Sequence, residues 1–201
     1  LEQIQSIQNQ EHQKWNLYIS DDGSQDNTIQ IIKDIQANDH RVKLVNFEKQ
    51  GGIVENFNKA LSFSNAEYIF LSDQDDAWYL EKNKRQVEIL SSHSEIEVLS
   101  ADIELNVSTS EAIVSTTYAF EDNNQELSKF PIERFYKAGF RQGMTLAIKK
   151  EFIDRFIKYW KEDYNLLPHD ALMECLAGML EVGYNLNENV AVHNRHETNA
   201  S

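Results

Sequence analysis

The sequence predicts an α/β domain built around a mostly parallel central sheet flanked by helices. Short apolar runs typical of buried strands alternate with segments of about ten residues whose apolar side chains recur at helical spacing. Such alternation is characteristic of right-handed βαβ units. Acidic side chains follow two of the apolar runs, and the carboxyl ends of strands are where open α/β sheets bind their ligands.

Composition narrows the class of protein. The chain has 201 residues, enough for one domain that buries a core without disulfides or a structural metal. Its 41% hydrophobic and 26% charged residues are typical of a folded globular protein. The formal net charge is −14, which argues against nucleic acid as a partner because phosphates need Lys and Arg. Length, composition and charge do not determine the oligomeric state.

The lone Cys175 excludes an intramolecular disulfide framework and suits a reducing compartment. It lies in an apolar stretch, where it is most simply a small buried hydrophobic residue. No apolar run reaches the length of a membrane span, and the start has no leader-type pattern. We therefore expect a cytoplasmic protein, with peripheral contact at the inner face of a membrane left open.

The first half of the chain predicts a regular succession of elements. A helix opens it, with Leu1, Ile4 and Ile7 at helical spacing, although a domain of this class normally opens with a strand. The usual first strand is therefore expected to be missing from this sequence. Strands are predicted at 15–20, 42–47, 67–72 and 96–100, and amphipathic helices at 27–37, 53–63 and 79–91.

The second half is less regular. Residues 104–130 are rich in Ser, Thr, Asn and Glu and predict a loop or a weak strand pair. Beyond them the pattern predicts strands at 144–149 and 184–193 and helices at 150–160 and 169–181. No linker or internal repeat divides the chain, so a single domain is expected.

The strongest candidate site is the segment LSDQDDAW, which places Asp73, Asp75 and Asp76 directly after an apolar strand. Three crowded carboxylates repel one another unless a cation is present, and Mg²⁺ and Mn²⁺ prefer such oxygens. The same three aspartates are explained about equally well by a solvated acidic turn that caps the helix at 79–91.

A second candidate is ISDDGSQDNT, again at the end of an apolar strand. Gly23 and Asp26 are explained by turn and cap chemistry, whereas the doubled Asp21-Asp22 is explained less well. A carboxylate there is suited to accept hydrogen bonds from a nucleobase or a ribose hydroxyl.

Two further segments carry titratable residues near the end of the chain. His169 and Asp170 open an apolar helix, where Asp170 is either a cap or a general base for a hydroxyl. His193 and His196 lie three residues apart, and His196 is either a metal ligand or part of an exposed tail. Nucleophile-elbow, Walker A, G-x-G-x-x-G and C-x-x-C motifs do not occur in the sequence.

These segments occur in an order that resembles glycosyltransferase family 2, most closely its bacterial rhamnosyltransferase-like branch. The resemblance rests on SDDGSQDNT, SFSNAEYIFLSDQDDAW, the strand entry at Gly143, HDALMECLA and RHETN, and it covers nearly the whole chain. It implies a GT-A fold over 1–201, with a nucleotide-binding part at 1–103 and an acceptor-side part at 104–201. It also implies a nucleotide-sugar donor, Mn²⁺ or Mg²⁺, and a glycan or lipid-linked acceptor in cell-surface polysaccharide synthesis.

The resemblance assigns a role to each candidate residue. Asp170 is implied to be the catalytic base of an inverting transfer, with His169 beside it in a supporting role. The implied donor-binding residues are Asp21, Asp22, Asp73 and Gly143. The implied metal ligands are Asp73, Asp75 and His196, with Asp76 and Arg195 in support.

Two features depart from the family pattern. The family's first strand is absent before Leu1. The usual tyrosine-arginine approach to the final histidine reads His193-Asn194-Arg195-His196 here, so Arg195 and His196 match but the tyrosine does not. A non-catalytic nucleotide-sugar or glycan-binding module of the same fold therefore remains the main alternative. A sugar nucleotidyltransferase and a metal-dependent phosphohydrolase are weaker alternatives, because neither accounts for all the motifs. The sequence does not identify the nucleotide, the sugar, the acceptor or the linkage.

Overall fold

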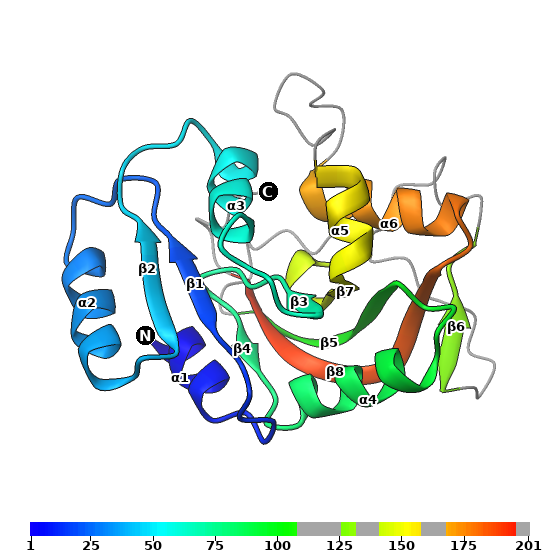
Figure 1. Cartoon of the computed structure of the whole chain (residues 1–201). Coiled ribbons are helices and arrows are strands. Elements are labelled where there is room, and N and C mark those ends of the chain that lie inside the picture. The colour runs from blue at the N-terminus through cyan, green and yellow to red at the C-terminus, as the bar shows by residue number, and fades with distance from the viewer. Residues whose placement is uncertain (108–125, 132–140, 158–167, 196–201) are drawn as a thin grey trace.

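The computed structural model describes residues 1–107, 126–131, 141–157 and 168–195. In these ranges the chain forms one two-stranded sheet and one six-stranded sheet, with helices against both (Figure 1). None of the described helices is long and apolar enough to cross a membrane.

The helices lie close to their predicted positions. They are α1 (Glu2–Gln8), α2 (Thr28–Asn38), α3 (Ile53–Leu61), α4 (Lys82–Ser92), α5 (Lys150–Phe156) and α6 (His169–Met179), with a 3₁₀ turn, η2, at Gly143–Thr145. The helix predicted at 150–160 is described only as far as residue 157, so its last part lies outside the described residues. The amphipathic spacing thus located every described helix to within a few residues.

The strands differ more from expectation. They are β1 (Leu17–Ser20), β2 (Val42–Asn46), β3 (Tyr68–Phe70), β4 (Ala77–Trp78), β5 (Val98–Val107), β6 (Leu127–Lys129), β7 (Ala147–Lys149) and β8 (Gly183–Arg195). β5 continues seven residues beyond the predicted end at 100, into the polar stretch that was expected to be a loop or a weak strand pair. The two-residue strand β4 was not predicted at all.

The longest ladder joins β5 to β8, which run parallel from Val98↔Gly183 to Val107↔Arg195. β1 and β2 also pair in parallel, so the parallel ladders contain most of the paired residues. The shorter contacts β3–β7, β5–β7, β4–β8 and β6–β8 are antiparallel. In the order β3-β7-β5-β8-β4 the consecutive strands β3 and β4 lie at opposite ends, where β3 pairs with β7 and β4 pairs with β8.

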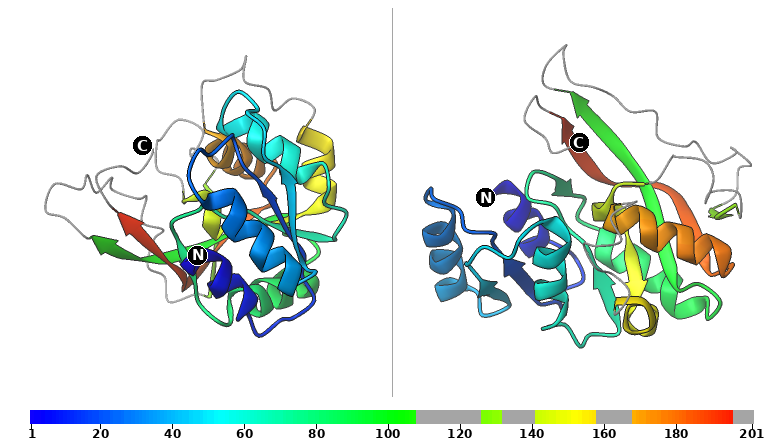
Figure 2. Two further views of the ribbon diagram at one scale, coloured as in Figure 1. Left: turned by 90° about the vertical axis from the view of Figure 1, so that its left-hand side faces the viewer. Right: turned by 90° about the horizontal axis from the view of Figure 1, so that it is seen from above.

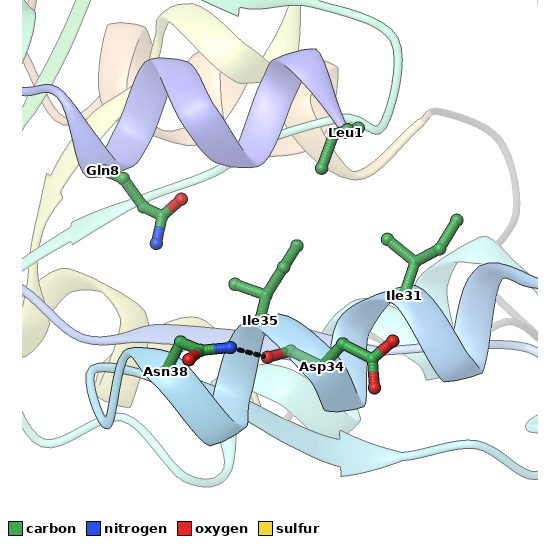
Figure 3. A pocket seen from close by; sticks show the side chains of 6 residues that line it. All are labelled: Leu1, Gln8, Ile31, Asp34, Ile35 and Asn38. Carbon is green, nitrogen blue, oxygen red and sulfur yellow. Dashed lines mark hydrogen bonds between the residues drawn. The ribbon is translucent and has the colours of Figure 1, made fainter.

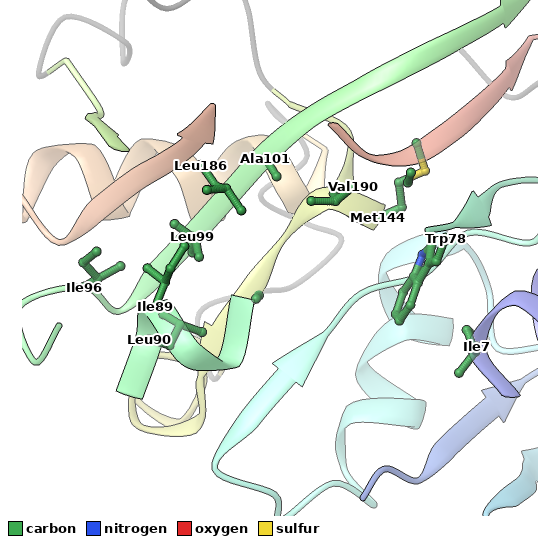
Figure 4. Close-up of a cluster of buried hydrophobic side chains, with 12 residues drawn as sticks. Ile7, Trp78, Ile89, Leu90, Ile96, Leu99, Ala101, Met144, Leu186 and Val190 are labelled. Atoms are coloured by element: carbon green, nitrogen blue, oxygen red, sulfur yellow. The ribbon is translucent and has the colours of Figure 1, made fainter. Parts of the chain in front are cut away.

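Neighbouring residues of β5 and β7 point to opposite faces of the sheet and into two separate cores. Leu99 and Ala147 pack with Leu90 of α4 on one face (Figure 4). On the other face Val98 and Ile148 pack with α5 and α6. The six-stranded sheet is therefore covered on both sides (Figures 1 and 2), as the α/β class requires.

A third, smaller core lies under α1 and α2. Ile4, Ile32 and Val42 are buried there, with the apolar side chains of β1 packed against them. α3 contacts β1 and β2 as well, so the two-stranded sheet also has helices beside it.

The chain is closely packed where β8 begins. A Cβ at Gly183 would stand 2.2 Å from Cδ2 of Phe130 and 2.9 Å from Cβ of Ala177. Both neighbours are fully or almost fully buried. We predict that Gly183→Ala lowers the free energy of unfolding by about 2–3 kcal/mol because the core must be displaced. Gly178→Ala is the matched control, since its nearest contact is 3.4 Å and it should leave stability within about 1 kcal/mol. Urea unfolding of both variants measures the difference, and equal stabilities would contradict the prediction.

Candidate active site

The acidic segment predicted from the sequence forms the connection between β3 and β4. Asp76 is 1% exposed, and its Oδ1 lies 2.7 Å from Nδ1 of His193. Its other oxygen, Oδ2, is buried and has no hydrogen-bond partner among the described residues. A buried carboxylate oxygen without a partner is costly, so Asp76 has an unfilled position for a donor or a cation.

The C-terminal end of β8 holds this segment in place. β4 pairs with β8 through Ala77↔Val192 and Trp78↔Ala191. Nδ2 of Asn194 donates a hydrogen bond of 2.8 Å to the backbone oxygen of Asp75. Three kinds of contact therefore fix the acidic segment to β8: a short ladder, the His193–Asp76 pair and this amide.

The ionisation of Asp73 is strongly perturbed. Burial and then the negative charges of Asp76, Asp170 and Asp75 raise its pKa to about 7, while the nearby His193 opposes the shift. The structure thus brings Asp170 close to the acidic segment although 94 or more residues separate them in the sequence. Near neutral pH the Asp73 carboxyl group therefore changes readily between its protonated and its ionised form.

Asp170 and His169 begin α6 and face the turn at Gly143. A Cβ at Gly143 would lie 3.4 Å from both Cβ of Asp170 and Nε2 of His169. The ring of His169 packs on Phe57 with centroids 4.2 Å apart, and burial lowers the pKa of this imidazole. Glycine at 143 therefore allows the η2 turn to approach the start of α6 closely.

Asp170 itself is partly exposed, and its Oδ1 accepts a hydrogen bond of 2.8 Å from the N–H of Ala171. The N-terminus of a helix is an electrostatically favourable place for a carboxylate. The side chain is thus held by its own helix and is open to a hydroxyl-bearing molecule.

Asp21 and Asp22 form a second acidic group at the end of β1. Both oxygens of Asp21 are occupied within its turn, by the N–H of Gly23 (2.9 Å), the N–H of Ser24 (2.7 Å) and Oγ of Ser24 (2.6 Å). Asp22 accepts a hydrogen bond from the N–H of Gln50. These contacts bear out the turn chemistry and tie two loops together, while the predicted donor-binding role of both residues stays a prediction.

The last two predicted residues are less defined. Arg195 ends β8 opposite Val107, and only its backbone position is described. His196 lies outside the described residues, so its predicted place among the metal ligands stays a prediction.

A pocket of about 380 Å³ lies elsewhere, between α1 and α2 (Figure 3). Its lining consists of Leu1, Gln8, Ile31, Asp34, Ile35 and Asn38. None of the catalytic, donor-binding or metal-binding candidates from the sequence lines it, so it is not part of the candidate site.

The acidic cluster has the donor chemistry that a hard divalent cation requires. Among the described residues no set of three His, Cys, Asp or Glu side chains is already arranged around one ion position. However, Mg²⁺ and Mn²⁺ sites commonly use one or two protein carboxylates and complete the shell with substrate phosphates. The unpartnered oxygen of Asp76 and the raised pKa of Asp73 fit such an incomplete site.

The sequence interpretation missed functional neighbours of the site. His193 was noticed for its spacing to His196, yet the structure places it directly on Asp76. The sequence signal that could have identified His193 was its position as a polar residue on the buried face of the apolar strand predicted at 184–193. Arg141 and Glu174 were also missed. Nothing in the local sequence of Arg141 distinguishes it from a surface charge, whereas the position of Glu174 within the apolar stretch ALMECLAGML was an available signal.

With the fold and the geometry established, comparison with known proteins defines the class. The family model described as "Glycosyl transferase family 2" matches residues 1–157, and the chain belongs to this family. The expected GT-A fold is confirmed by its structural neighbours. One of these neighbours is Staphylococcus aureus TarS 1–349 in complex with UDP. It has a TM-score of 0.73 and 16% identity, and the match covers 96% of this chain and 55% of that chain.

The mannosyltransferase PcManGT from Pyrobaculum calidifontis, solved with GDP-Man and Mn²⁺, has a TM-score of 0.65. It is 16% identical and covers 96% of this chain and 52% of that chain. At such identities both structures support the fold alone.

Sequence relatives are closer. The dTDP-rhamnosyl transferase RfbG of Shigella flexneri is 32% identical over 163 residues, which are 79% of this chain and 53% of the relative. The UDP-Glc:alpha-D-GlcNAc-diphosphoundecaprenol beta-1,3-glucosyltransferase WfgD of Escherichia coli is 32% identical over 87 residues, 43% of this chain and 34% of the relative. The chain thus spans about half or less of the length of these two relatives.

The raised pKa of Asp73 predicts a pH dependence of stability. An unfolded Asp has a pKa near 3.8 and the folded one near 7, so between these values the folded state holds an extra proton. The free energy of unfolding should therefore decrease as the pH rises from 5 to 8. We expect a loss of about 2 kcal/mol, roughly half of what the full shift would give, because Asp73 keeps some solvent contact.

The measurement is urea unfolding of the wild-type chain and of Asp73→Asn at several pH values without divalent cations. The difference between the two free energies isolates Asp73 from the other carboxylates. A difference that is constant from pH 5 to pH 8 would show that Asp73 titrates normally.

Proposed function

We propose that the chain is the catalytic part of an inverting, metal-dependent glycosyltransferase. It would transfer a hexosyl or rhamnosyl group from a nucleotide-sugar donor to a hydroxyl of a glycan or lipid-linked acceptor in cell-surface polysaccharide synthesis. One observation carries the proposal: Asp170, from the start of α6, lies close enough to the acidic segment after β3 to raise the pKa of Asp73. A candidate base and a candidate diphosphate site thus meet in one place.

The donor side is assigned to residues 1–103 and the acceptor side to 104–201. Asp21 and Asp22 would contact the nucleotide, and Gly143 would lie near the donor sugar. Asp73 and Asp75 would hold Mn²⁺ or Mg²⁺, with His196 completing the site and Asp76 and Arg195 supporting it. When bound, the cation would neutralise negative charge on the diphosphate leaving group. The nucleotide sugars named for the relatives and neighbours support this class of donor.

The chain's own residues would carry the remaining steps. Asp170 would accept the proton of the acceptor hydroxyl while that oxygen attacks the anomeric carbon from the face opposite the nucleotide. The new glycosidic C–O bond would form as the bond from the anomeric carbon to the phosphate oxygen breaks, and the diphosphate would leave with the electron pair. His169, packed on Phe57, would keep the start of α6 in position. No covalent enzyme intermediate is required, in agreement with the absence of a nucleophile-elbow motif from the sequence.

The proposed location is the cytoplasmic side of the membrane, with peripheral contact to a lipid-linked acceptor. The single cysteine, which is free and buried, agrees with a reducing compartment.

Nucleotide binding tests the donor side. In calorimetric titrations we expect one of UDP, dTDP and GDP to bind in the presence of Mn²⁺ and to bind at least tenfold more weakly without it. Asp75→Ala should remove the effect of Mn²⁺, because it removes a proposed ligand of the cation. Asp34→Ala, an exposed carboxylate on α2, is the matched control and should bind like the wild type. Equal binding with and without Mn²⁺ would contradict the metal assignment.

Transfer tests the acceptor side. Asp170→Asn should lower the transfer rate by about 10²–10⁴-fold, the usual contribution of a general base, while the nucleotide Kd changes less than twofold. The assay follows nucleotide diphosphate release from the matching nucleotide sugar with an acceptor present. Transfer at the wild-type rate in Asp170→Asn would remove the base assignment. Tight donor binding without turnover in the wild type would instead identify a non-catalytic module.

A further inference from the structure

Behind the candidate site lies a buried group of charged and polar side chains that takes no part in the proposed chemistry. Arg141, immediately before the η2 turn, is 7% exposed. Its guanidinium forms an ion pair with Asp102 of β5, at 2.5 Å between Nη2 and Oδ1. Its Nε lies 3.4 Å from Oδ1 of Asn185 in β8, and Nδ2 of Asn185 donates to the same Asp102 oxygen at 3.0 Å. The side chain is thereby fixed to the centre of the long β5–β8 ladder.

The backbone of Arg141 is fixed to a different element. Its N–H donates a hydrogen bond of 2.9 Å to Oε1 of Glu174, a side chain that is 0% exposed. Glu174 belongs to α6 and lies four residues after Asp170, so both side chains are on one face of that helix. Arg141 thus joins the sheet to the helix that carries the proposed base.

The turn that follows Arg141 lies against Asp170. Gly143 is two residues further along, and a Cβ there would already lie 3.4 Å from Asp170 and His169. The turn is also held from its other side, because Nε2 of Gln86 donates a hydrogen bond of 2.8 Å to the backbone oxygen of Thr145. The position of the turn relative to Asp170 is therefore set mainly by buried hydrogen bonds.

A buried ion pair of this kind is weak evidence for a role in stability. Removing two charges from water costs about as much as their attraction returns, and apolar replacements of similar volume are often neutral or stabilising. Charged hydrogen bonds are, however, directional and fix the geometry of the groups that they join. The arrangement therefore suits a positioning role better than a purely stabilising one.

We propose that Glu174 and Arg141 are positioning residues for the transfer reaction, which hold the turn at Gly143 and the start of α6 at the separation that Asp170 requires. This inference rests on the proposed function and identifies residues that act through Asp170 without touching the substrate. Glu174 and Arg141 are therefore expected to affect the rate of transfer and to leave donor binding unchanged.

The test compares two variants of Glu174. Glu174→Gln keeps an oxygen that can accept from the Arg141 N–H, whereas Glu174→Met has similar length and no acceptor. We expect Glu174→Met to lower kcat for transfer about tenfold or more, with the donor KM and the nucleotide Kd changed less than twofold. Glu174→Gln should stay within about threefold of the wild-type kcat. Glu151→Met, at an exposed position of α5, controls for the loss of a negative charge.

A second readout needs neither donor nor metal. Amide hydrogen exchange of Arg141 should be at least tenfold faster in Glu174→Met than in the wild type and should remain protected in Glu174→Gln. Asp102→Asn tests the other end of Arg141 at a partly exposed position, and it should lower kcat about fivefold at unchanged nucleotide Kd. This variant keeps the inference testable if Glu174→Met does not fold.

The outcomes separate the inference from the proposed function. If the wild type transfers sugar and Glu174→Met does so at the same rate, the positioning role is wrong and the proposed function stands. Equal losses of kcat in the Met and Gln variants, or a parallel loss of nucleotide binding, would also overturn it. If the wild type binds nucleotide but shows no transfer, the proposed function fails, and the inference fails with it.

Discussion

The parallel ladder between β5 and β8 is the interaction on which the other parts of the structure depend. β8 pairs with β5, β4 and β6, and its residues Leu186, Val190 and Ala191 belong to the core beneath α4. The same strand carries Asn185 to the buried polar group and His193 to the acidic segment. The site is therefore assembled by one central strand, and a change of register in β8 would separate His193 from Asp76.

The register of this ladder is irregular in its middle. Ala101 pairs with Leu186 but Asp102 pairs with Asn189, so β8 has two additional residues at that step. A smaller shift follows between Asp102 and Ile103. Such bulges redirect side chains. Asn185 and His193 are eight residues apart on β8, but they pair with Ser100 and Leu105, which are five residues apart on β5. Simple alternation along β8 therefore does not predict how these two side chains are oriented relative to each other.

The sequence predicted the parts of the fold that depend on local pattern. Helices α1 to α6 follow from apolar residues at helical spacing, and the acidic segment follows from three Asp residues directly after an apolar run. The extension of β5 through polar residues was not predictable, because its pairing with β8 and not its own composition makes it a strand. The role of Arg141 was hidden for a similar reason: its partners Asp102, Glu174 and Asn185 are distant in sequence and meet only in the folded chain.

The distribution of charge distinguishes the two buried polar groups. The Arg141 guanidinium faces the carboxylate of Asp102 and the side-chain amide of Asn185. In the acidic segment Asp73 faces Asp76, Asp170 and Asp75, with only His193 to oppose them, and Asp76 Oδ2 lacks a partner among the described residues. In the proposed function, a bound cation would offset the negative charge that accumulates around Asp73.

The excess of negative charge at the acidic segment affects how an anionic donor would enter. A chain of net charge −14 with an uncompensated acidic cluster repels a diphosphate at the place where the proposed reaction needs it. Under the proposed function, positive charge would arrive with the donor or before it, and Asp73 would give up its proton when the cation binds. The charge of Asp170 is one of those that raise the pKa of Asp73, so the two carboxylates are electrostatically linked. In the proposed reaction Asp73 would balance charge at the cation, whereas Asp170 would accept the proton of the acceptor hydroxyl.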